Sequence, residues 1–565
     1  RDFLDAAGAK RYQNIEVELP NFESTPFDEE ERNDFVGTTK EVLSRLSVAS
    51  QKGLVERFDS SIGNGTVLSP YGGRTYHTET EGMAALIPVL GKETTTASLM
   101  AYGYNPKISK WSPYHGAMYA VVESVAKIVA MGGNYHTIRF SFQEYFEKLL
   151  DDPKRWGKPL AALLGANRVQ QELKLPSIGG KDSMSGTFEN ISVPPTLVSF
   201  AITASDVHDV MTPEAKEAGH ILAEVQIKKD QFRVFDFDHL QKQYDAIQDL
   251  MKQKKIYSAY TVKDGGVIEA VCKMAFGNGL GAAFNTDHTL ASYVEKNYGN
   301  IIVEVKSEKD LVSLDYRVVA TLNDSEKFSY GMDTISIQEA YAINKAPLES
   351  VYPTREKAPT QEIKVAECKT RSTLKAKQYI ETPLVVIPVF PGTNCEYDSK
   401  RAFEKAGAKV ELVLIRNKTE EMLKTSIDEL ENAIKRANIV MLPGGFSAGD
   451  EPEGSGKFIA TVLRNPRLKA AISDLLDNRD GLMIGICNGF QALIKLGLLP
   501  YGEIRDMSEN DATLTFNTIG RHLSQFVDTR IGSVKSPWLA NVNVGDVHVI
   551  PISHGEGRFV APKEV

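Results

Sequence analysis

The stretch with the most suggestive chemistry is Gly485-Ile486-Cys487-Asn488-Gly489, which holds a cysteine between two glycines. The apolar run 482–484 precedes it and an apolar-periodic helix pattern follows, so the cysteine falls where a strand becomes a helix. A Gly-x-nucleophile-x-Gly turn projects its central side chain over the carboxyl end of a sheet. The positive end of the following helix would favour the thiolate and lower the pKa of the thiol. We therefore expect Cys487 to be a nucleophile.

A lone cysteine at a tight strand–helix junction is more often a buried, inert thiol. The flanking glycines reverse that expectation for Cys487, because such a turn leaves no room for a side chain beside a nucleophile. Gln491, one helical turn further on, adds to the case for Cys487. Cys395, in PGTNCEYD (391–398), is a rival nucleophile that lacks the glycine pair.

A second glycine pair supports the same site. The apolar run 438–442 leads into Pro443-Gly444-Gly445-Phe446, which indicates a strand ending in a tight loop. Backbone N–H groups exposed at such a loop can stabilise an oxyanion, although a plain turn would show the same pattern. The residues expected to hold the substrate and its oxyanion are Gly444, Gly445, Phe446, Asn488 and Gln491.

The loop at 179–186, GGKDSMSG, combines a glycine pair, a cation and hydroxyl groups, which together can cradle a phosphate. It lacks the spacing of a Walker motif, and on spacing alone a polar β-turn is the favoured interpretation. The residues expected to contact a phosphate are Gly179, Gly180, Lys181, Asp182, Ser183 and Ser185.

The overall composition excludes several classes of protein. The chain has 565 residues, is 42% hydrophobic and 25% charged, and carries a net charge of −9, which argues against nucleic-acid and anionic-membrane partners. It contains no apolar run of about 18 residues, as a transmembrane helix would need. Its four cysteines stand in no CxxC spacing, so we expect a reduced, cytoplasmic protein.

Composition and periodicity divide the chain. Residues 353–382 are charged and weakly periodic, as in a linker, and apolar runs then alternate with helical patterns, as in a parallel sheet covered on both faces. Upstream, residues 115–133 predict an amphipathic helix, and DDPKRWGKP (151–159) predicts a break before a helix at 160–173. The expected segments are an end region with linker at 1–32, units at 33–211 and 212–352, the linker 353–382, and a final domain at 383–565.

Three motifs, PGGFSAGD, GICNGFQ and SHGEGRF, together resemble the glutaminase domain of the phosphoribosylformylglycinamidine synthase family. Upstream, residues 48–63, 178–207 and 262–281 resemble the second half of that family's synthetase region. The resemblance implies an α/β and α+β multidomain fold. An aminoimidazole ribonucleotide synthetase-like half, with a ferredoxin-like N-terminal part and an α/β C-terminal part, would precede a class I glutamine amidotransferase domain with a flavodoxin-like parallel sheet.

The resemblance also implies a reaction. Formylglycinamide ribonucleotide, ATP and glutamine would give formylglycinamidine ribonucleotide, ADP, phosphate and glutamate, with ammonia released at Cys487. ATP and Mg²⁺ would serve the full enzyme, the loop 179–186 would face nucleotide and substrate phosphate, and the first half of the enzyme would be a partner outside this chain. The chain begins in a helical pattern (2–12) and both ends look cut, so we expect a C-terminal piece with a truncated final domain.

Two alternatives stay open at this point. The chain could be a non-catalytic structural or nucleotide-binding half of a larger assembly, or another cysteine-dependent amidohydrolase. In the family, the base of the glutaminase comes from a His-Pro-Glu motif that follows SHGEGR, and this sequence lacks it, so we expect the catalytic histidine and glutamate to be missing from the chain. The alternatives are that His554 and Glu556, in the order His-x-Glu, supply them directly, or that His554 only shapes the loop near the site.

The family's second half often carries an auxiliary nucleotide with magnesium, and here the sequence departs from the pattern. Glu123 is a candidate metal ligand, but Lys127 stands one turn on where the family has asparagine. Thr261 replaces an acid and Lys263 a hydroxyl, and a further acid aligns loosely near Glu81. A charged lysine has no lone pair for a metal. We therefore expect neither magnesium nor nucleotide in this auxiliary site, unless both lysines simply extend into solvent.

Overall fold

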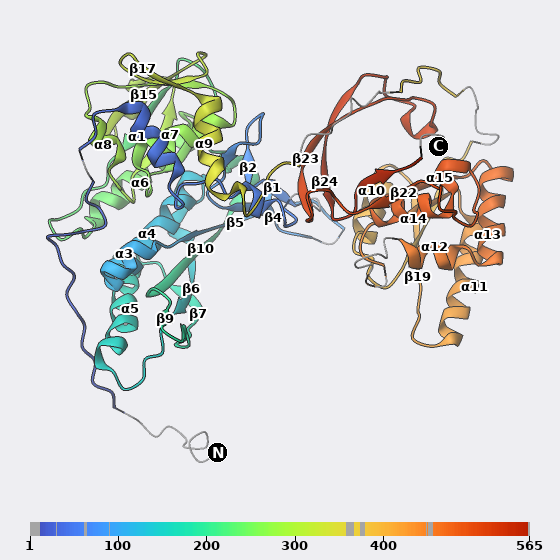
Figure 1. Ribbon diagram of the computed structural model, residues 1–565, viewed down its shortest axis with the longest axis horizontal. Helices are drawn as coiled ribbons and strands as arrows, with labels where there is room; N and C mark the ends of the chain where they lie inside the picture. The colour runs from blue at the N-terminus through green and yellow to red at the C-terminus, as the bar shows by residue number, and fades with distance from the viewer. Residues whose placement is uncertain are drawn as a thin grey trace. The chain divides into compact units, whose positions relative to one another are not determined.

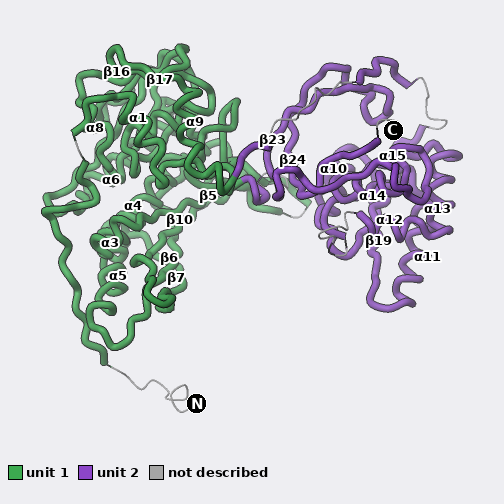
Figure 2. Tube along the Cα trace, in the orientation of Figure 1, with its two compact units in different colours: residues 1–55, 65–352 green, residues 56–64, 353–565 purple. Residues whose placement is uncertain are grey.

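The computed structural model describes residues 12–29, 31–60, 65–89, 91–356, 366–372, 379–447, 449 and 456–562. The chain forms two compact units, a first unit of residues 1–55 and 65–352 and a second unit of residues 56–64 and 353–565 (Figure 2). Most of the expected N-terminal helix, and residues 357–365 and 373–378 of the expected linker, lie outside the described residues.

The first sheet of the first unit has the strand order β1-β4-β5-β10-β6-β7 and is antiparallel except for the parallel pair β6/β7. Its strands are β1 (Thr66–Leu68), β4 (Met83–Leu86), β5 (Thr96–Gly103), β10 (Thr196–Asp206), β6 (Arg139–Tyr145) and β7 (Ser177–Lys181). Helix α4 (Pro113–Ala130) packs on β5 and β10, and α5 (Pro153–Leu173) packs on α4 (Figure 1). Short strand pairs join β2 (Tyr71–Gly72) to β3 (Thr78–Glu79) and β8 (Thr187–Phe188) to β9 (Ile191–Ser192).

Two helices of this unit differ from expectation. Helix α4 is buried at almost every position from His115 to Ala130, so it is a central core helix and not an amphipathic one. Helix α5 begins at Pro153, so the expected break over 151–159 is wrong from that residue onward. A proline fits the first helical position because its missing N–H has no partner there, and Asp152 caps the helix by accepting the next N–H groups.

The second sheet of the first unit has the order β12-β14-β11-β15-β13-β16-β17. Alternate residues of its strands face two cores: Ala223 and Val303 lie with α4 and α6 (Phe237–Lys252), whereas Leu222 and Ile302 lie with α7 (Gly266–Phe276). Its strands are β12 (Ile256–Thr261), β14 (Ile301–Val305), β11 (Ile221–Val225), β15 (Tyr316–Asn323), β13 (Gly281–Phe284), β16 (Lys327–Tyr330) and β17 (Asp333–Ser336).

Further α-helices of the first unit include the short α2 (Lys52–Val55) and α8 (Leu290–Val294). Helix α1 (Phe35–Ser44) precedes both sheets in the sequence, yet its buried side chains lie in the core with α7. It packs against α9 (Ile337–Glu349), which closes the unit, and the short α3 (Pro106–Trp111) leads into α4.

The second unit contains a four-stranded parallel sheet in the order β19-β18-β20-β21, which confirms the parallel sheet expected after the linker. Helices cover both of its faces, α11, α12 and α14 on one side and α10 on the other. The strands are β18 (Leu384–Val389), β19 (Lys409–Leu414), β20 (Ile439–Leu442) and β21 (Leu482–Gly485). The helices are α10 (Glu396–Lys405), α11 (Glu420–Arg436), α12 (Lys457–Leu463), α13 (Pro466–Ser473), α14 (Asn488–Leu496) and α15 (Leu498–Tyr501).

Two antiparallel strand pairs follow that sheet in the sequence, β22 (Thr513–Thr515) with β25 (Arg558–Val560), and β23 (Leu523–Arg530) with β24 (Val547–His554). The predicted fold class is thus confirmed, since mixed helix-and-sheet layers are followed by a parallel-sheet domain. Within the described part of the chain, every helix is too short or too polar to cross a membrane.

Candidate active site

Cys487 occupies a sharp turn between β21 and α14. Its backbone has φ 53° and ψ −110°, a left-handed conformation that a non-glycine residue rarely adopts and that strand–helix nucleophile turns require. A Cβ on Gly485 would lie 2.6 Å from the Gly489 carbonyl carbon, and a Cβ on Gly489 would lie 2.0 Å from the Leu442 carbonyl oxygen. The two glycines are therefore needed because the backbones of the turn and of β20 touch here.

Polar backbone groups surround the Cys487 thiol. The N–H groups of Asn488 and Gly445 donate to its sulfur, and the thiol itself donates to the Ser553 carbonyl across 3.8 Å. Although Cys487 is exposed as a residue, the surrounding protein removes enough solvent from its thiol to raise the pKa above its ordinary value, and the two N–H groups offset only part of that. The expected lowering of the Cys487 pKa is therefore wrong for this state, since desolvation outweighs the helix terminus.

The oxyanion donors differ in one respect from expectation. The Phe446 N–H donates to the Gly392 carbonyl at 2.8 Å, so it is already engaged, and the neighbouring Gly445 N–H faces the sulfur in its place. Gly445 has φ 127°, and a Cβ there would lie 2.6 Å from the Gly392 carbonyl oxygen. Glycine at this position thus allows the loop after β20 to press against residues 392–394 while its N–H points at the thiol.

The side chains of Asn488 and Gln491 hold the turn to its surroundings. Asn488 accepts the Ser447 N–H through Oδ1 at 3.3 Å and donates through Nδ2 to the Gln491 Oε1 at 3.1 Å. Gln491 in turn donates to the Glu556 carbonyl at 3.0 Å. Both amides are buried, so their polar atoms brace the loops that carry the site as well as lining it.

A cavity of about 470 Å³ opens onto Cys487. The sequence-predicted residues that line it are Gly445, Phe446, Cys487, Asn488, Gln491, His554 and Glu556, and the others are Phe516, Asn517, Gly520, Arg521, His522, Ser553 and Gly555. The residues missed by sequence reasoning come mainly from the segment between β22 and β23. Its Asn-Thr-Ile-Gly run signals a loop, but nothing in its spacing indicates a site.

Two imidazoles line this cavity. His554 Nδ1 lies 2.9 Å from the Asn517 Oδ1, and burial together with the nearby His522 lowers the pKa of His554. His522 Nε2 lies 3.0 Å from the Ser553 Oγ and 3.3 Å from the Asp59 Oδ1, and the Ser553 hydroxyl also donates to Asp59. Among the described contacts, none joins either imidazole to the Cys487 sulfur.

Cys395, the rival nucleophile, lies beside the same loop. A Cβ on Gly444 would stand 3.3 Å from the Cys487 Cβ and 3.6 Å from the Cys395 Sγ. Cys395 has the N-cap position of α10 with an ordinary negative φ of −113°, and it is not among the residues that line the cavity. Burial and the neighbouring Asp398 raise the pKa of Cys395, as burial raises that of Cys487, so the two cysteines differ in the strained turn and the cavity, which Cys395 lacks.

The glycine-rich loop 179–186 lies in the first unit, at the edge strand β7 and just beyond it. Residues 177–182 are exposed, and a Cβ on Gly179, which has φ 148°, would meet nothing within 4 Å. The hydroxyl groups of Ser183 and Ser185 lie 2.9 Å apart. Burial and the nearby Asp182 raise the pKa of Glu144 on β6 to about 7. The loop thus presents backbone and Lys181 to solvent next to a carboxyl of weakened acidity.

The residues around Glu123 do not fit a magnesium ion. Lys127 Nζ lies 2.7 Å from the Glu123 Oε1, and Lys263 Nζ lies 3.0 Å from the Glu81 Oε1, so both carboxylates already have a cation. The lysines are not extended into solvent, since their side chains are 6% and 18% exposed. Among the described residues, no group of three or more His, Cys, Asp or Glu side chains is arranged to hold a metal.

Comparison with known proteins defines the class first: residues 382–565 match the family model of the CobB/CobQ-like glutamine amidotransferase domain. The curated relatives then give the particular resemblance. The chain is 35% identical over 179 residues to phosphoribosylformylglycinamidine synthase subunit PurQ of Methanococcus maripaludis, and 35% identical over 175 residues to that subunit of Dehalococcoides mccartyi. The chain thus resembles phosphoribosylformylglycinamidine synthase, as its motifs predict.

The extent of these matches is limited. Each alignment covers 31% of this chain, and it spans 59% and 62% of the two relatives. Among solved structures, T. maritima PurL complexed with FGAR matches with a TM-score of 0.43 and 13% identity, covering 67% of this chain and 60% of that one.

Proposed function

We propose that the second unit hydrolyses glutamine at Cys487 and releases its amide nitrogen as ammonia. The observation that carries the proposal is the strained turn at Cys487, which opens onto a cavity with two backbone N–H groups aimed at the sulfur. A cavity of about 470 Å³ has room for a small amino acid. The family of residues 382–565 supplies the substrate class, because its members are glutamine amidotransferases.

The chemistry follows from the site. The Cys487 thiolate attacks the side-chain amide carbon of glutamine, and the oxygen that gains charge takes over the N–H groups of Gly445 and Asn488 from the sulfur. The C–N bond breaks when the nitrogen accepts a proton and leaves as ammonia, and a γ-glutamyl thioester remains on Cys487. Water then hydrolyses the thioester to glutamate and returns the thiol.

A base must take the proton of the thiol, because burial keeps Cys487 protonated near neutral pH. We propose His554 for this role among the described residues, with Glu556 following it in the sequence. The lowered pKa of His554 keeps its imidazole neutral near pH 7, which is the form that accepts a proton. His522 is engaged by Ser553 and Asp59, so it is better placed to hold the wall of the cavity.

We further propose that the whole enzyme uses this ammonia, with ATP and Mg²⁺, to convert formylglycinamide ribonucleotide to formylglycinamidine ribonucleotide in the cytoplasm. Two things support this reaction: the PurQ relatives of the second unit and the synthetase-type motifs of the first. The loop 179–186, exposed over residues 179–182, would contact the phosphates of nucleotide and substrate, and ATP would activate the formamide oxygen for displacement by ammonia. The domain arrangement proposed is the one expected above, with segments at 1–32, 33–211, 212–352, 353–382 and 383–565.

Replacement of the nucleophile tests the proposal. In the full enzyme, Cys487→Ser should abolish glutamine hydrolysis and glutamine-dependent synthesis, while synthesis from added ammonium salt persists. Cys395→Ser is the matched control and should retain both. Loss of the ammonia-dependent reaction in Cys487→Ser, with the fold intact, would contradict the proposal that Cys487 acts only in the release of ammonia from glutamine. Glutamine hydrolysis without any ATP-dependent synthesis would favour a simple cysteine-dependent amidohydrolase.

The base is tested separately. His554→Ala should lower glutamine hydrolysis by about 10²–10⁴-fold, the usual contribution of a general base. His522→Ala, which alters the same cavity, is the control and should act more on KM than on kcat. If His554→Ala hydrolyses glutamine at the rate of the unaltered enzyme, the base lies elsewhere.

A further inference from the structure

The first unit contains a buried cluster of opposite charges that the proposed reaction does not use. Its acids come from α4, from α7 and from the chain at and just after β3, and its bases come from α4, from α7 and from the loop after β12. The members are Glu79, Glu81, Glu123, Glu269, Lys127, Lys263 and Lys273, here called the lysine–glutamate cluster.

Lys127 satisfies Glu123 within helix α4. Its ammonium lies 2.7 Å from the Glu123 Oε1, donates to the Tyr102 carbonyl at 2.8 Å and stands 4.6 Å above the centre of the Tyr102 ring. The two side chains are only 6% and 9% exposed. An ammonium with these partners has its charge and donors occupied, and it takes the space next to the Glu123 carboxylate.

Glu81 is satisfied even more completely. One of its oxygens accepts the Thr261 N–H at 2.6 Å, and the other accepts the Thr261 hydroxyl and the Lys263 ammonium, the latter at 3.0 Å. Burial alone would lower the pKa of Lys263, but Tyr260, Glu81, Glu269 and Glu123 raise it well above its ordinary value. Lys263 therefore stays charged and lies within the field of both Glu81 and Glu123.

The third lysine continues the alternation of charges. Lys273 lies 2.7 Å from the Glu79 Oε2 and 3.0 Å from the Glu269 Oε1, and its side chain is 5% exposed. The second oxygen of Glu269 accepts the Gly265 N–H at 2.9 Å. Each of the four carboxylates in the cluster thus has a lysine within 3.0 Å, which leaves no unneutralised pair of acids for an ion.

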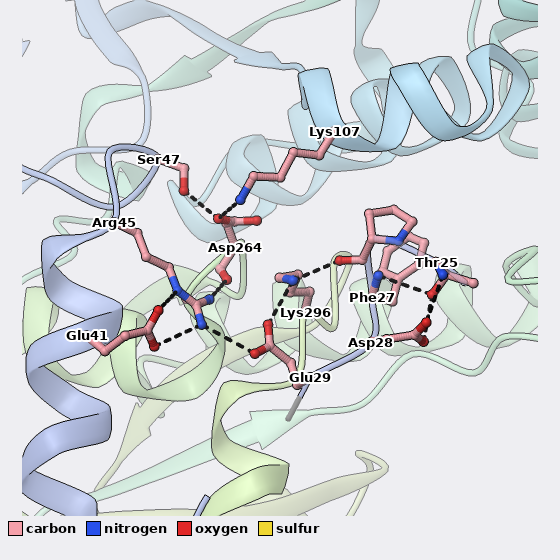
Figure 3. Close-up of polar contacts among 12 residues, drawn as sticks. Thr25, Phe27, Asp28, Glu29, Glu41, Arg45, Ser47, Lys107, Asp264 and Lys296 are labelled. Carbon is pink, nitrogen blue, oxygen red and sulfur yellow. Dashed lines mark hydrogen bonds and ion pairs between the residues drawn. The ribbon is translucent and has the colours of Figure 1, made fainter. Parts of the chain in front are cut away.

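The turn that carries Lys263 is fixed from its other side as well (Figure 3). Asp264 accepts hydrogen bonds from Ser47 and from Lys107, the latter at 3.4 Å, and its carbonyl accepts one from Arg45 at 2.9 Å. The Arg45 guanidinium also bonds Glu41 and Glu29, and Glu29 pairs with Lys296 at 2.8 Å. The turn is tied directly to two other segments, residues 45–47 and helix α3, and would need to break these bonds to admit a ligand.

Magnesium requires a nearly octahedral shell of oxygen ligands at about 2.1 Å and usually keeps several waters. In the lysine–glutamate cluster the carboxylate oxygens accept hydrogen bonds from ammonium and hydroxyl donors. They therefore do not converge on a common point where such an ion could bind. Buried carboxylates need a compensating positive charge, and lysine can supply it permanently where a metal supplies it reversibly.

We propose that Lys127 and Lys263 are built-in counter-ions that replace a divalent cation between Glu123 and Glu81. The first unit then keeps this region folded without a magnesium nucleotide, and the region serves as structure. This inference holds whether or not Cys487 hydrolyses glutamine, because it rests on contacts within the first unit alone.

Manganese, which scatters anomalously and takes the same ligands as magnesium, provides the direct test. Crystals of the full enzyme grown with Mn²⁺ and ADP should show no anomalous peak at the carboxylates of Glu123 and Glu81. A peak bonded to either carboxylate, with ADP beside it, would overturn the proposal.

A gain-of-binding variant sharpens the test. Lys127→Asn combined with Thr261→Asp removes one counter-ion and adds an acid, so the first unit should become dependent on metal. Millimolar Mg²⁺ with ADP should then raise the Tm of this variant by about 5 °C more than that of the unaltered protein. Lys110→Asn, at an exposed lysine on α3, is the control and should respond as the unaltered protein does.

If the double variant folds and its Tm rises no more than that of the control, the lysines are not standing in for a cation and the proposal is wrong. If the double variant fails to fold, the anomalous map of the unaltered enzyme still decides the question.

Discussion

The two units treat buried polar chemistry in opposite ways. In the second unit, Cys487 is held in a strained turn, and backbone donors and a cavity converge on its sulfur. In the first unit, four glutamates are neutralised by three lysines of the same chain, and all four are buried except the half-buried Glu79. The Cys487 turn is strained and leaves room for a ligand, whereas the charged groups of the lysine–glutamate cluster are already paired with one another. A cluster of charged residues is therefore not in itself a sign of catalysis. A cavity lined by hydrogen-bond donors that a ligand can reach is a better sign.

The largest expected effect concerns the lysine–glutamate cluster. Lys127→Met leaves the buried Glu123 carboxylate without its cation, which should lower the free energy of unfolding of the first unit by about 3–5 kcal/mol. The measurement is chemical denaturation followed by a probe of that unit. Adding Glu123→Gln to the same variant should recover most of the loss, because the uncompensated charge is then gone. If the single and double variants are equally unstable, packing and not charge dominates the site.

The next effect concerns the strained turn. Gly489→Ala would place a Cβ 2.0 Å from the Leu442 carbonyl oxygen, so the turn must shift and carry Cys487 with it. A misplacement of about 1 Å at a nucleophile costs about 100-fold in rate, and we expect at least that loss of kcat for glutamine hydrolysis. Gly502→Ala, at a left-handed glycine with open space around it, is the control and should keep the rate. Equal activity of Gly489→Ala and the unaltered enzyme would mean that the close approach is not needed.

A smaller, graded effect concerns pH. Because burial raises the pKa of Cys487 above its ordinary value, its thiolate fraction should grow about tenfold per pH unit through neutral pH and on into the alkaline range. Alkylation of Cys487 by iodoacetamide in the absence of glutamine should follow that slope, as measured by mass spectrometry of the labelled peptide. A rate that levels off below pH 8 would show an activated thiolate and would restore the expectation from the helix terminus.

The smallest effect separates the two neighbouring cysteines. Cys395→Ser should change kcat/KM for glutamine hydrolysis by less than about threefold, since a half-buried thiol outside the cavity makes no contact with substrate. Steady-state kinetics measure this directly. A loss as large as that of Cys487→Ser would make Cys395 part of the reacting centre.

Sequence reasoning found the elements whose signals are local. The spacing of Gly485, Cys487 and Gly489 predicts a tight turn, and the alternation of strand and helix patterns predicts the parallel sheet. The rest of the cavity could not be found in this way, because Asp59, His522 and Ser553 meet through long-range contacts. No motif spacing records such a meeting.

The errors also have physical reasons. The pKa of Cys487 depends on how much solvent the fold removes, which a sequence does not show. The Phe446 N–H donates a hydrogen bond to the Gly392 carbonyl, and only the tertiary structure brings these two groups together. Lys127 and Lys263 were recognised as departures from a metal pattern, but only the structure distinguishes a buried counter-ion from a lysine in solvent.

The account depends most on covalent chemistry at Cys487, and trapping the intermediate tests it most directly. The full enzyme is mixed with glutamine, quenched in acid within one turnover and digested for mass spectrometry. The γ-glutamyl group should be found as a thioester on the peptide that contains Cys487. Three results would contradict covalent catalysis at Cys487. They are a glutamyl group on the Cys395 peptide, full-rate hydrolysis by the unaltered enzyme with no adduct on Cys487, and full-rate hydrolysis by Cys487→Ser.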